Sequence, residues 1–249
     1  MTSTRATMLS IVLLVLEMPV GEGASAASAE ISQRLHTQGT QPPPGIVQAR
    51  DYKITNFQYN DVNWESEKCA KILFVRREGW GAKDTKNVNY LNINGGVKLV
   101  FYHHTEGHEC NSTDVCAKIL RHWQEYHQET KRWDDIGYNF MIGGDGQVYE
   151  GRGFNRVGAH TLSYNNMSVS LGFVGNYTFH APSSRMLAAA ADLIKCGIEW
   201  GKIGPDYKLY GQRDANYRDC PGDAFYALIK TDARFGGRLE PYIYTPPPV

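Results

Sequence analysis

The sequence predicts an α/β fold with a mixed central β-sheet flanked by helices. Short apolar runs rich in β-branched and aromatic residues alternate with longer segments whose apolar residues recur at helical spacing. The turn Gly143-Gly144-Asp145-Gly146 joins two of these runs and is a strong hairpin signal. The 249 residues suit one ordinary domain with extensions. This interleaving of strands and helices is typical of a sheet covered by helices.

The expected strands are apolar segments bounded by glycines or polar turns. Residues 97–104 (VKLVFYHH) form the clearest one, since the run is β-branched and aromatic and follows two glycines. The others are expected at residues 138–142, 147–150, 169–174 and 208–210.

The expected helices begin at residues that can cap a helix. One runs over about residues 112–129, which Ser112 or Thr113 can cap. The clearest runs over about residues 182–200, with an apolar stripe and Gly201 after its end. A last, short helix should begin near Pro221-Gly222-Asp223.

The two ends of the chain differ in composition from its centre. Residues 1–26 are expected to be a signal peptide, because Arg5 precedes a short apolar run and small residues follow it. The alternative is an uncleaved anchor, but the run is about half the length of a membrane span. Residues 27–68 are expected to be a polar, Pro-rich linker and residues 236–249 a Pro-rich tail, both with little folded structure.

The central domain, residues 69–235, is therefore expected to be soluble and extracellular. Lys and Arg together number 26, as do Asp and Glu, so no basic surplus points to nucleic acid or an anionic membrane. The five cysteines fit an oxidising compartment. Three glycosylation sequons begin at Asn111, Asn166 and Asn176.

Four residues could carry chemistry, and each also has an ordinary structural explanation. His103 and His104 are adjacent on a strand, so they point to opposite faces and could be packing or surface residues. Cys220 precedes Pro-Gly near a helix start, which favours a thiolate, but it could be a buried inert cysteine or an intermolecular bridge. Tyr138 could orient water or stabilise an oxyanion, or could be a half-buried sheet aromatic.

Several longer runs occur in order over about two-thirds of the chain. They are Glu78-Gly79-Trp80-Gly81-Ala82, Phe101-Tyr102-His103-His104-Thr105, residues 133–140 (WDDIGYNF), residues 143–153 (GGDGQVYEGRG), Val157-Gly158-Ala159-His160 and Cys220-Pro221-Gly222-Asp223. Through these runs the segment from Arg76 to about Phe235 resembles the peptidoglycan recognition proteins. It is also similar to the type-2 amidase domain of phage lysozyme-like amidases.

The resemblance implies binding of bacterial peptidoglycan by its muramyl-peptide stem, in an antibacterial, innate-immunity role. Active members of the family cleave the amide between N-acetylmuramate and L-alanine with zinc. Carried over, the zinc ligands are His103, position 212 and Cys220. Tyr138 matches the catalytic tyrosine, and Arg218 stands where a Lys or Thr assists in other members.

The resemblance also implies disulfides and groove residues. Cys110 and Cys116 are six residues apart and match a common family disulfide, while Cys69 and Cys196 match a second one. The substrate groove would be lined by His104, Lys131, Trp133, Tyr138, His160 and Asn165. Aromatic rings would supply flat apolar contact, and the polar side chains would meet the amides and carboxylates of the stem.

The sequence departs from the amidase pattern at position 212, where it has Gln instead of His. An amide oxygen is a harder and weaker zinc ligand than an imidazole nitrogen, so zinc occupancy is doubtful. The first hypothesis is a secreted receptor that binds peptidoglycan with amidase activity reduced or lost.

Two alternatives remain open. In the first, Gln212, His104 or His108 completes a variant zinc site and the protein is an active N-acetylmuramoyl-L-alanine amidase, although strand alternation argues against His104. In the second, the fold serves another interaction. The pair Arg132-Trp133 matches only in part the Gly-Trp of members that prefer diaminopimelate stems, so neither stem type is predicted. A signalling partner is conceivable, but the sequence does not identify it.

Overall fold

The computed structural model describes residues 46–48, 69–92 and 94–244. The expected signal peptide and most of the expected linker lie outside these residues. Within the described part of the chain, no helix is long and apolar enough to cross a membrane.

A seven-stranded mixed sheet forms the centre of the fold, which confirms the predicted class. The strand order is β1-β2-β5-β4-β6-β3-β7. The pairs β1/β2 and β5/β4 are antiparallel, and the remaining neighbours run parallel. The strands are β1 Ile46–Gln48, β2 Leu73–Val75, β3 Val97–His104, β4 Phe140–Ile142, β5 Val148–Glu150, β6 Ser168–Phe173 and β7 Ile203–Gly211.

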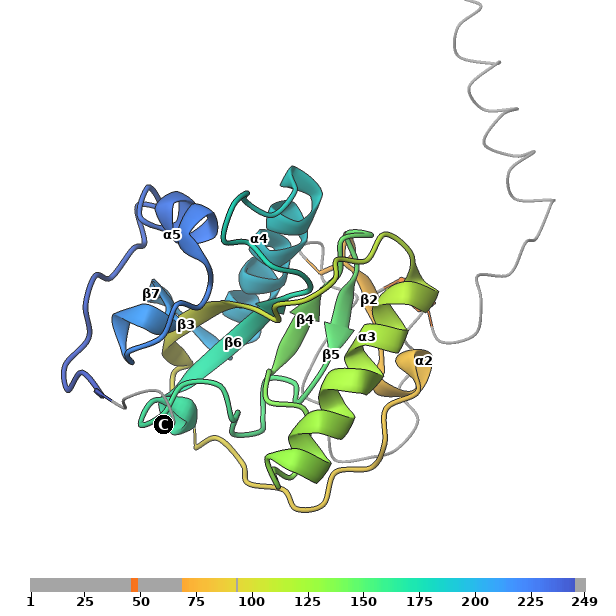
Figure 1. Cartoon of the computed structure of the whole chain (residues 1–249). Helices are drawn as coiled ribbons and strands as arrows, with labels where there is room; N and C mark the ends of the chain where they lie inside the picture. The colour runs from red at the N-terminus through yellow and green to blue at the C-terminus, as the bar shows by residue number, and fades with distance from the viewer. Residues whose placement is uncertain (1–45, 49–68, 93, 245–249) are drawn as a thin grey trace, which may run out of the picture. The chain divides into compact units, whose positions relative to one another are not determined.

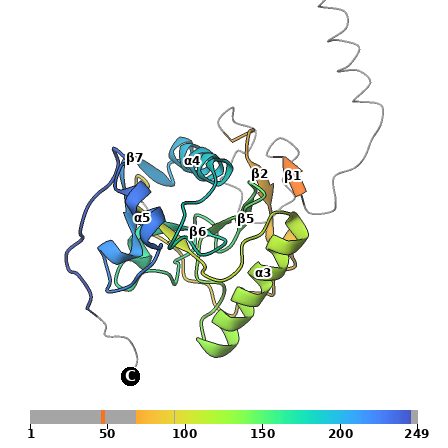
Figure 2. The same cartoon turned by 45° about the horizontal axis from the view of Figure 1, so that its top comes forward.

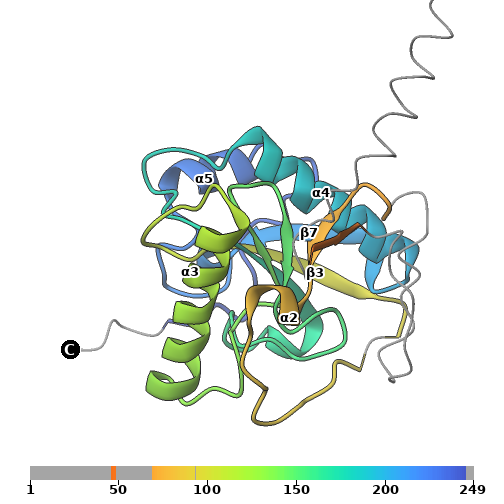
Figure 3. The ribbon, with the colours of Figure 1, turned by 90° about the vertical axis from the view of Figure 1, so that its right-hand side faces the viewer.

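Helices cover both faces of the sheet, as Figures 1 and 3 show for α3 and α4. They are α2 Arg77–Trp80, α3 Thr113–Glu125, α4 Ser184–Glu199 and α5 Asp223–Ile229, with a π-helix η2 Tyr126–Thr130 and 3-10 turns η3 Asn165–Met167 and η4 Gln212–Asp214. The helix α4 begins where its cap was expected, because the Ser183 side chain accepts the Met186 N–H at 3.4 Å. It ends before Gly201, whose φ of 65° lies in the left-handed region.

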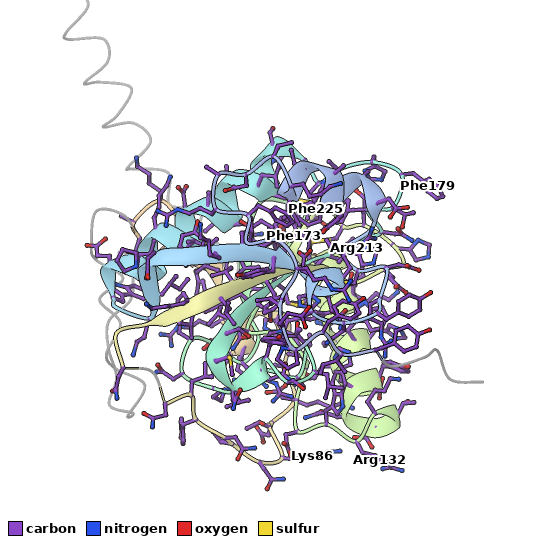
Figure 4. The ribbon with its side chains drawn as sticks, turned by 90° about the vertical axis from the view of Figure 1, so that its left-hand side faces the viewer. Lys86, Arg132, Phe173, Phe179, Arg213 and Phe225 are labelled. Carbon is purple, nitrogen blue, oxygen red and sulfur yellow. A yellow bond between two sulfur atoms is a disulfide. The ribbon has the colours of Figure 1, made fainter. Side chains whose placement is uncertain are left out.

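Alternating strand residues feed two separate cores. Phe140 and Ile142 pack in the cluster under α4 and α5, whereas Met141 between them packs under α2 and α3. Phe173 of β6 meets Phe225 of α5 at a ring-centroid distance of 4.6 Å, a contact labelled in Figure 4. Figure 2 shows α4 and α5 near each other at the β7 side of the molecule.

Five elements differ from the sequence-based expectation. The strand β7 is longer than residues 208–210 and includes Pro205, which lies where the register of β7 against β3 shifts between Ile203 and Lys208, an irregularity at which a strand tolerates proline. The helix over residues 112–129 changes at Tyr126 from α to π. The short elements β2 and α2 were not anticipated, and β1 falls within the expected linker.

Two disulfides tie loops to helices. Cys69 pairs with Cys196 of α4, closing a sequence separation of 127 residues, and Cys110 pairs with Cys116 of α3. These are the two pairs that the resemblance implied. Cys220 is the free cysteine of the described residues.

A buried carboxylate lies where α2, α3 and the loop before β4 meet. Asp135 is 1% exposed and accepts ion pairs from Arg77 at 3.0 Å and Arg156 at 3.3 Å. It also accepts hydrogen bonds from Gln124 at 2.7 Å and from the Ile136 N–H at 2.8 Å. Every neighbour of this carboxylate is a donor, so the buried charge is compensated.

The segment after α5 packs against the domain, although residues 236–249 were expected to have little folded structure. We call residues 234–244 the C-terminal strap. Its backbone bonds to Leu209 on β7, to Asp214 on η4 and to Ala215 and Tyr217 just beyond. In Figure 1 this segment is the blue chain that descends beside β7. Composition indicated a linker, but these contacts are made by backbone atoms, which composition does not reveal.

Candidate functional site

The site lies at the C-terminal end of β3, where strand alternation separates the two adjacent histidines. Phe101 and His103 face one side of the sheet, and Tyr102 packs in the core on the other side. His103 is 1% exposed. The His104 ring turns away from it, since its Nδ1 accepts the Tyr177 N–H at 3.3 Å.

Four side chains from distant parts of the chain surround the His103 ring. Cys220 Sγ lies 3.3 Å from its Nδ1, and Thr161 Oγ1 lies 3.2 Å from its Nε2. The rings of Tyr138 and His160 lie at centroid distances of 5.4 and 5.2 Å. The structure therefore brings together His103, Tyr138, His160 and Cys220, which the sequence placed in one site.

Tyr138 is positioned by close packing on β6. It lies two residues before β4, not within a strand as expected, and its hydroxyl donates to the His104 carbonyl at 3.4 Å. A Cβ on Gly172 would come within 2.9 Å of the Tyr138 ring, so only glycine leaves room for it. Burial is the main cause that raises the pKa of Tyr138, so the phenol is neutral at pH 7.

The Cys220 thiol does not have the lowered pKa that its place before a helix suggested. Burial raises its pKa to about 12. The helix α5 starts three residues later and has only seven residues, so its dipole does not offset the loss of hydration.

The histidines of the site are neutral at pH 7. Burial, with a smaller contribution from neighbouring His104, lowers the pKa of His103 to about 3. Burial also lowers the pKa of His160 well below its usual value. His160 Nδ1 lies 3.0 Å from Thr161 Oγ1, while its Nε2 is buried without a hydrogen-bond partner.

Gln212 is tied to the opposite wall of the site. Its side-chain Nε2 donates to the His160 carbonyl at 2.9 Å. Its own carbonyl accepts the N–H groups of Ala215 and Asn216, which closes the turn η4. The side chain therefore bridges two loops that are 52 residues apart in the sequence.

These donors fit the zinc that the family implies only in part. Two ligands of one tetrahedral zinc, with Zn–S of about 2.3 Å and Zn–N of about 2.0 Å, lie roughly 3.5 Å apart. The 3.3 Å between His103 Nδ1 and Cys220 Sγ is close to that spacing. The third place has an amide engaged with a backbone carbonyl, and the described residues contain no group of three His, Cys, Asp or Glu that could hold a metal. The set does not fit a three-ligand catalytic zinc site.

A row of ring contacts leads from Tyr138 through His127 to Trp133. Trp133 stacks on His127 at 4.7 Å, and His127 meets the Tyr138 ring at 6.1 Å. His127 Nδ1 accepts the Gly137 N–H at 3.1 Å, which fixes the turn that carries Tyr138. Trp133 is half-buried, so one part of its ring remains open to a ligand.

The remaining expected site residues are more peripheral. Lys131 is exposed, with its ammonium 5.6 Å above the Tyr126 ring. Asn165 Oδ1 accepts the N–H groups of His160 and Thr161, both at 2.8 Å, so this oxygen shapes the loop. Arg218 is exposed and donates to the Tyr217 carbonyl at 2.7 Å. His104 is 4% exposed and outside the row of rings.

Sequence reasoning missed two residues that organise the site. Thr161 is fully buried and its hydroxyl lies between the rings of His103 and His160. His127 lies in the π-helix, whose wider turn directs its ring toward Trp133. In the sequence, Thr161 could have been noticed only because it directly follows the candidate residue His160. Nothing in the sequence around His127 indicated a role in the site.

Comparisons with known proteins agree with this arrangement. The family model described as N-acetylmuramoyl-L-alanine amidase (Amidase_2) matches residues 94–223. Peptidoglycan-recognition protein 2 of Holotrichia diomphalia is 40% identical over 163 residues, which are 66% of this chain and 85% of that protein. An N-acetylmuramoyl-L-alanine amidase of Sus scrofa is 41% identical over 57% of this chain and 24% of its own length.

A solved structure shows the same fold with a ligand bound. A mutant of Drosophila PGRP-LB in complex with tracheal cytotoxin has a TM-score of 0.63 and 40% sequence identity, and the match covers 65% of this chain and 95% of that one. The chain belongs to the Amidase_2 family, which includes the peptidoglycan-recognition proteins and the N-acetylmuramoyl-L-alanine amidases.

Proposed function

We propose that this protein is a secreted receptor of innate immunity that binds bacterial peptidoglycan through its muramyl-peptide stem, with amidase activity reduced or lost. The observation that supports this proposal most strongly is the hydrogen bond from Gln212 Nε2 to the His160 carbonyl. A histidine at this position would supply a nitrogen ligand, whereas the glutamine amide is held as a bridge between two loops. Without a third strong ligand, stable zinc and its activated water are not expected.

The groove retains the features that binding needs. Trp133 and Tyr138 are half-buried and can offer flat apolar contact to a sugar or an alanine methyl group, while the rings of His127, His103 and His160 are buried around them. The buried Nε2 of His160 has no partner among the described residues, so it keeps hydrogen-bonding capacity that a stem amide could use where binding opens the site. The complex of a Drosophila relative with tracheal cytotoxin supports a muramyl peptide as the ligand.

Secretion is part of the same proposal. Disulfides persist in oxidising compartments and are rare in the cytosol, and two are present. The asparagines of the three sequons, Asn111, Asn166 and Asn176, are exposed and could accept glycans.

One observation favours the alternative of an active zinc amidase. His103 Nδ1 and Cys220 Sγ lie 3.3 Å apart, close to the spacing of two ligands on one zinc ion. If the Gln212 side chain breaks its hydrogen bond to the His160 carbonyl and rotates, the Gln212 amide oxygen becomes available as a third, weak zinc ligand.

Zinc content and amide cleavage separate the two functions. The secreted protein, Gln212→His and Gln212→Asn would be incubated with zinc and with peptidoglycan, and bound zinc and released stem peptide would be measured. We expect Gln212→His to bind close to one zinc per chain and to release stem peptide. The natural protein and Gln212→Asn, which keeps an amide, should do neither while still binding a muramyl peptide.

The contrary result is equally clear. Stem-peptide release by the unaltered protein, abolished by Cys220→Ala, would establish the amidase and refute a non-catalytic receptor. Failure of the unaltered protein to bind muramyl peptide in calorimetry would refute both functions.

A further inference from the structure

Two exposed tyrosines form a ring pair outside the groove. Tyr217 and Tyr244 are 50% and 67% exposed, with ring centroids 4.9 Å apart and ring planes inclined at 42°. A single exposed aromatic residue is common on protein surfaces, but a pair from distant segments makes a contiguous apolar patch. We call these two residues the tyrosine shelf.

Backbone contacts hold the shelf in place. The Tyr217 N–H donates to the Ile243 carbonyl at 3.1 Å, and the Ile243 N–H donates to the Ala215 carbonyl at 2.8 Å. Asn216 and Ile243 form a parallel bridge between the rings' two segments. Because the backbone fixes both tyrosines, a ligand that stacks on them loses little freedom in ordering the protein.

The C-terminal strap supplies half of the shelf. Tyr244 lies on the strap, after residues 94–223 that match the family model. A second anchor holds the strap at the same place, where the Tyr164 hydroxyl donates to the Pro241 carbonyl at 2.9 Å. The shelf is therefore built partly by chain that the amidase pattern does not describe.

A buried asparagine joins the shelf to the wall of the groove. Asn216 is 2% exposed, and its side chain both accepts from the Leu162 N–H at 3.1 Å and donates to the Leu162 carbonyl at 3.3 Å. Leu162 is two residues beyond His160, and the Asn216 N–H bonds to the Gln212 carbonyl at 2.9 Å. The tyrosine shelf thus adjoins both loops that the Gln212 amide ties together.

We propose that the tyrosine shelf is a second carbohydrate subsite, which binds a hexopyranose ring of the glycan strand next to the muramyl residue in the groove. This inference rests on the proposed function. A pyranose presents C–H groups on its flat faces and hydroxyls at its rim, and a tyrosine presents an apolar ring face with a polar tip. Peptidoglycan is a polymer, so a stem in the groove carries neighbouring sugars that must lie along an adjacent surface.

Ligands with a single stem peptide test the proposal without multivalent binding. Calorimetry would compare a muramyl peptide containing one sugar with a tetrasaccharide that carries one identical stem. We expect the unaltered protein to bind the tetrasaccharide roughly five- to tenfold more tightly, a gain equivalent to about one good aromatic contact. The double variant Tyr217→Ala/Tyr244→Ala should lose this gain, and Tyr217→Phe/Tyr244→Phe should keep most of it.

The control is Tyr90→Ala, which removes a tyrosine that is 66% exposed elsewhere on the surface and should leave the gain intact. Equal affinity of the unaltered protein for both ligands would overturn the shelf, as would a double alanine variant that keeps the gain. A double variant that binds both ligands more weakly by the same factor would also overturn it, because the tyrosines would then act through the groove. Absence of binding to either ligand by the unaltered protein would instead refute the proposed function.

Discussion

The buried polar clusters around Asp135 and around His103 are satisfied very differently. Around Asp135, two guanidinium groups, an amide and a backbone N–H all donate to one carboxylate. Around His103, the rings of His103 and His160 share the hydroxyl of Thr161, the Cys220 thiol lies 3.3 Å from His103 Nδ1, and His160 Nε2 has no hydrogen-bond partner among the described residues. The first cluster is complete without a ligand, whereas the second leaves hydrogen-bonding capacity for one.

The difference teaches how a buried polar group can be assigned to structure or to binding. A charge that is fully compensated holds elements together, and its removal leaves the partner charges stranded. Neutral histidines such as His103 and His160, one of them with an unpaired nitrogen, contribute little to stability. The free-energy cost of burying an unpaired polar group is tolerated where that group can bind a ligand. The comparison leads to the following expectations.

The largest effect is expected at the complete cluster. Asp135→Ala leaves the buried Arg156 and the half-buried Arg77 without their carboxylate, so unfolding free energy should fall by about 3–5 kcal/mol. Urea denaturation measures it. Glu125→Gln is the matched control, since Glu125 pairs with Lys83 on the surface and should cost under about 1 kcal/mol. Equal losses from both variants would remove the distinction between the two clusters.

Acid should lower the stability of the folded protein through the buried histidines around His103. The folded pKa of His160 is lowered by burial, and the unfolded value is about 6.5. Below pH 6.5 the unfolded chain therefore takes up a proton that the folded chain does not, and stability is lost as pH falls from 6.5 toward the folded pKa. Between pH 6.5 and 5.5 each such histidine costs roughly 1 kcal/mol. His160→Gln should lessen the pH dependence by about that amount in urea titrations, and an unchanged slope would show that His160 protonates in the folded state.

The smallest effect is expected from the hydroxyl between the rings. Thr161→Val removes one hydrogen-bonding group shared by His103 and His160, so the loss of unfolding free energy should be about 1 kcal/mol. The same urea measurement applies, with Thr231→Val as an exposed control, since the Thr231 hydroxyl donates to the Leu228 carbonyl on the surface. A loss as large as that of Asp135→Ala would mean that the cluster around His103 also contributes strongly to the stability of the fold.

Much of the frame was predictable, because strand and helix periodicity depends on side chains visible in the sequence. The strand at residues 97–104 and the opposite directions of His103 and His104 follow from period-two alternation. The gathering of His103, Tyr138, His160 and Cys220 followed from the resemblance. The partner of Gln212 could not be predicted, because it is a backbone carbonyl that leaves no trace in residue identity.

Two expectations failed for related physical reasons. The place of Cys220 before a helix suggested a thiolate, but burial of the sulfur outweighs the field of a seven-residue helix. The Pro-rich composition after residue 235 suggested a tail, yet backbone groups of Gly236, Leu239 and Ile243 find partners on β7, on η4 and just beyond, and residues 245–249 lie outside the described residues. Both effects depend on surroundings that only the folded chain supplies.

In the receptor proposed above, the link between Gln212 and the His160 carbonyl would have a kinetic consequence. An enzyme directs binding energy into the transition state and releases altered products, whereas a groove that leaves the amide intact keeps that energy in the bound complex. Occupancy is then reversible and follows the local concentration of cell-wall fragments, and the residence time is set by dissociation alone. The Gln212 carboxamide would thereby convert a hydrolytic site into a site whose occupancy reports the concentration of cell-wall fragments.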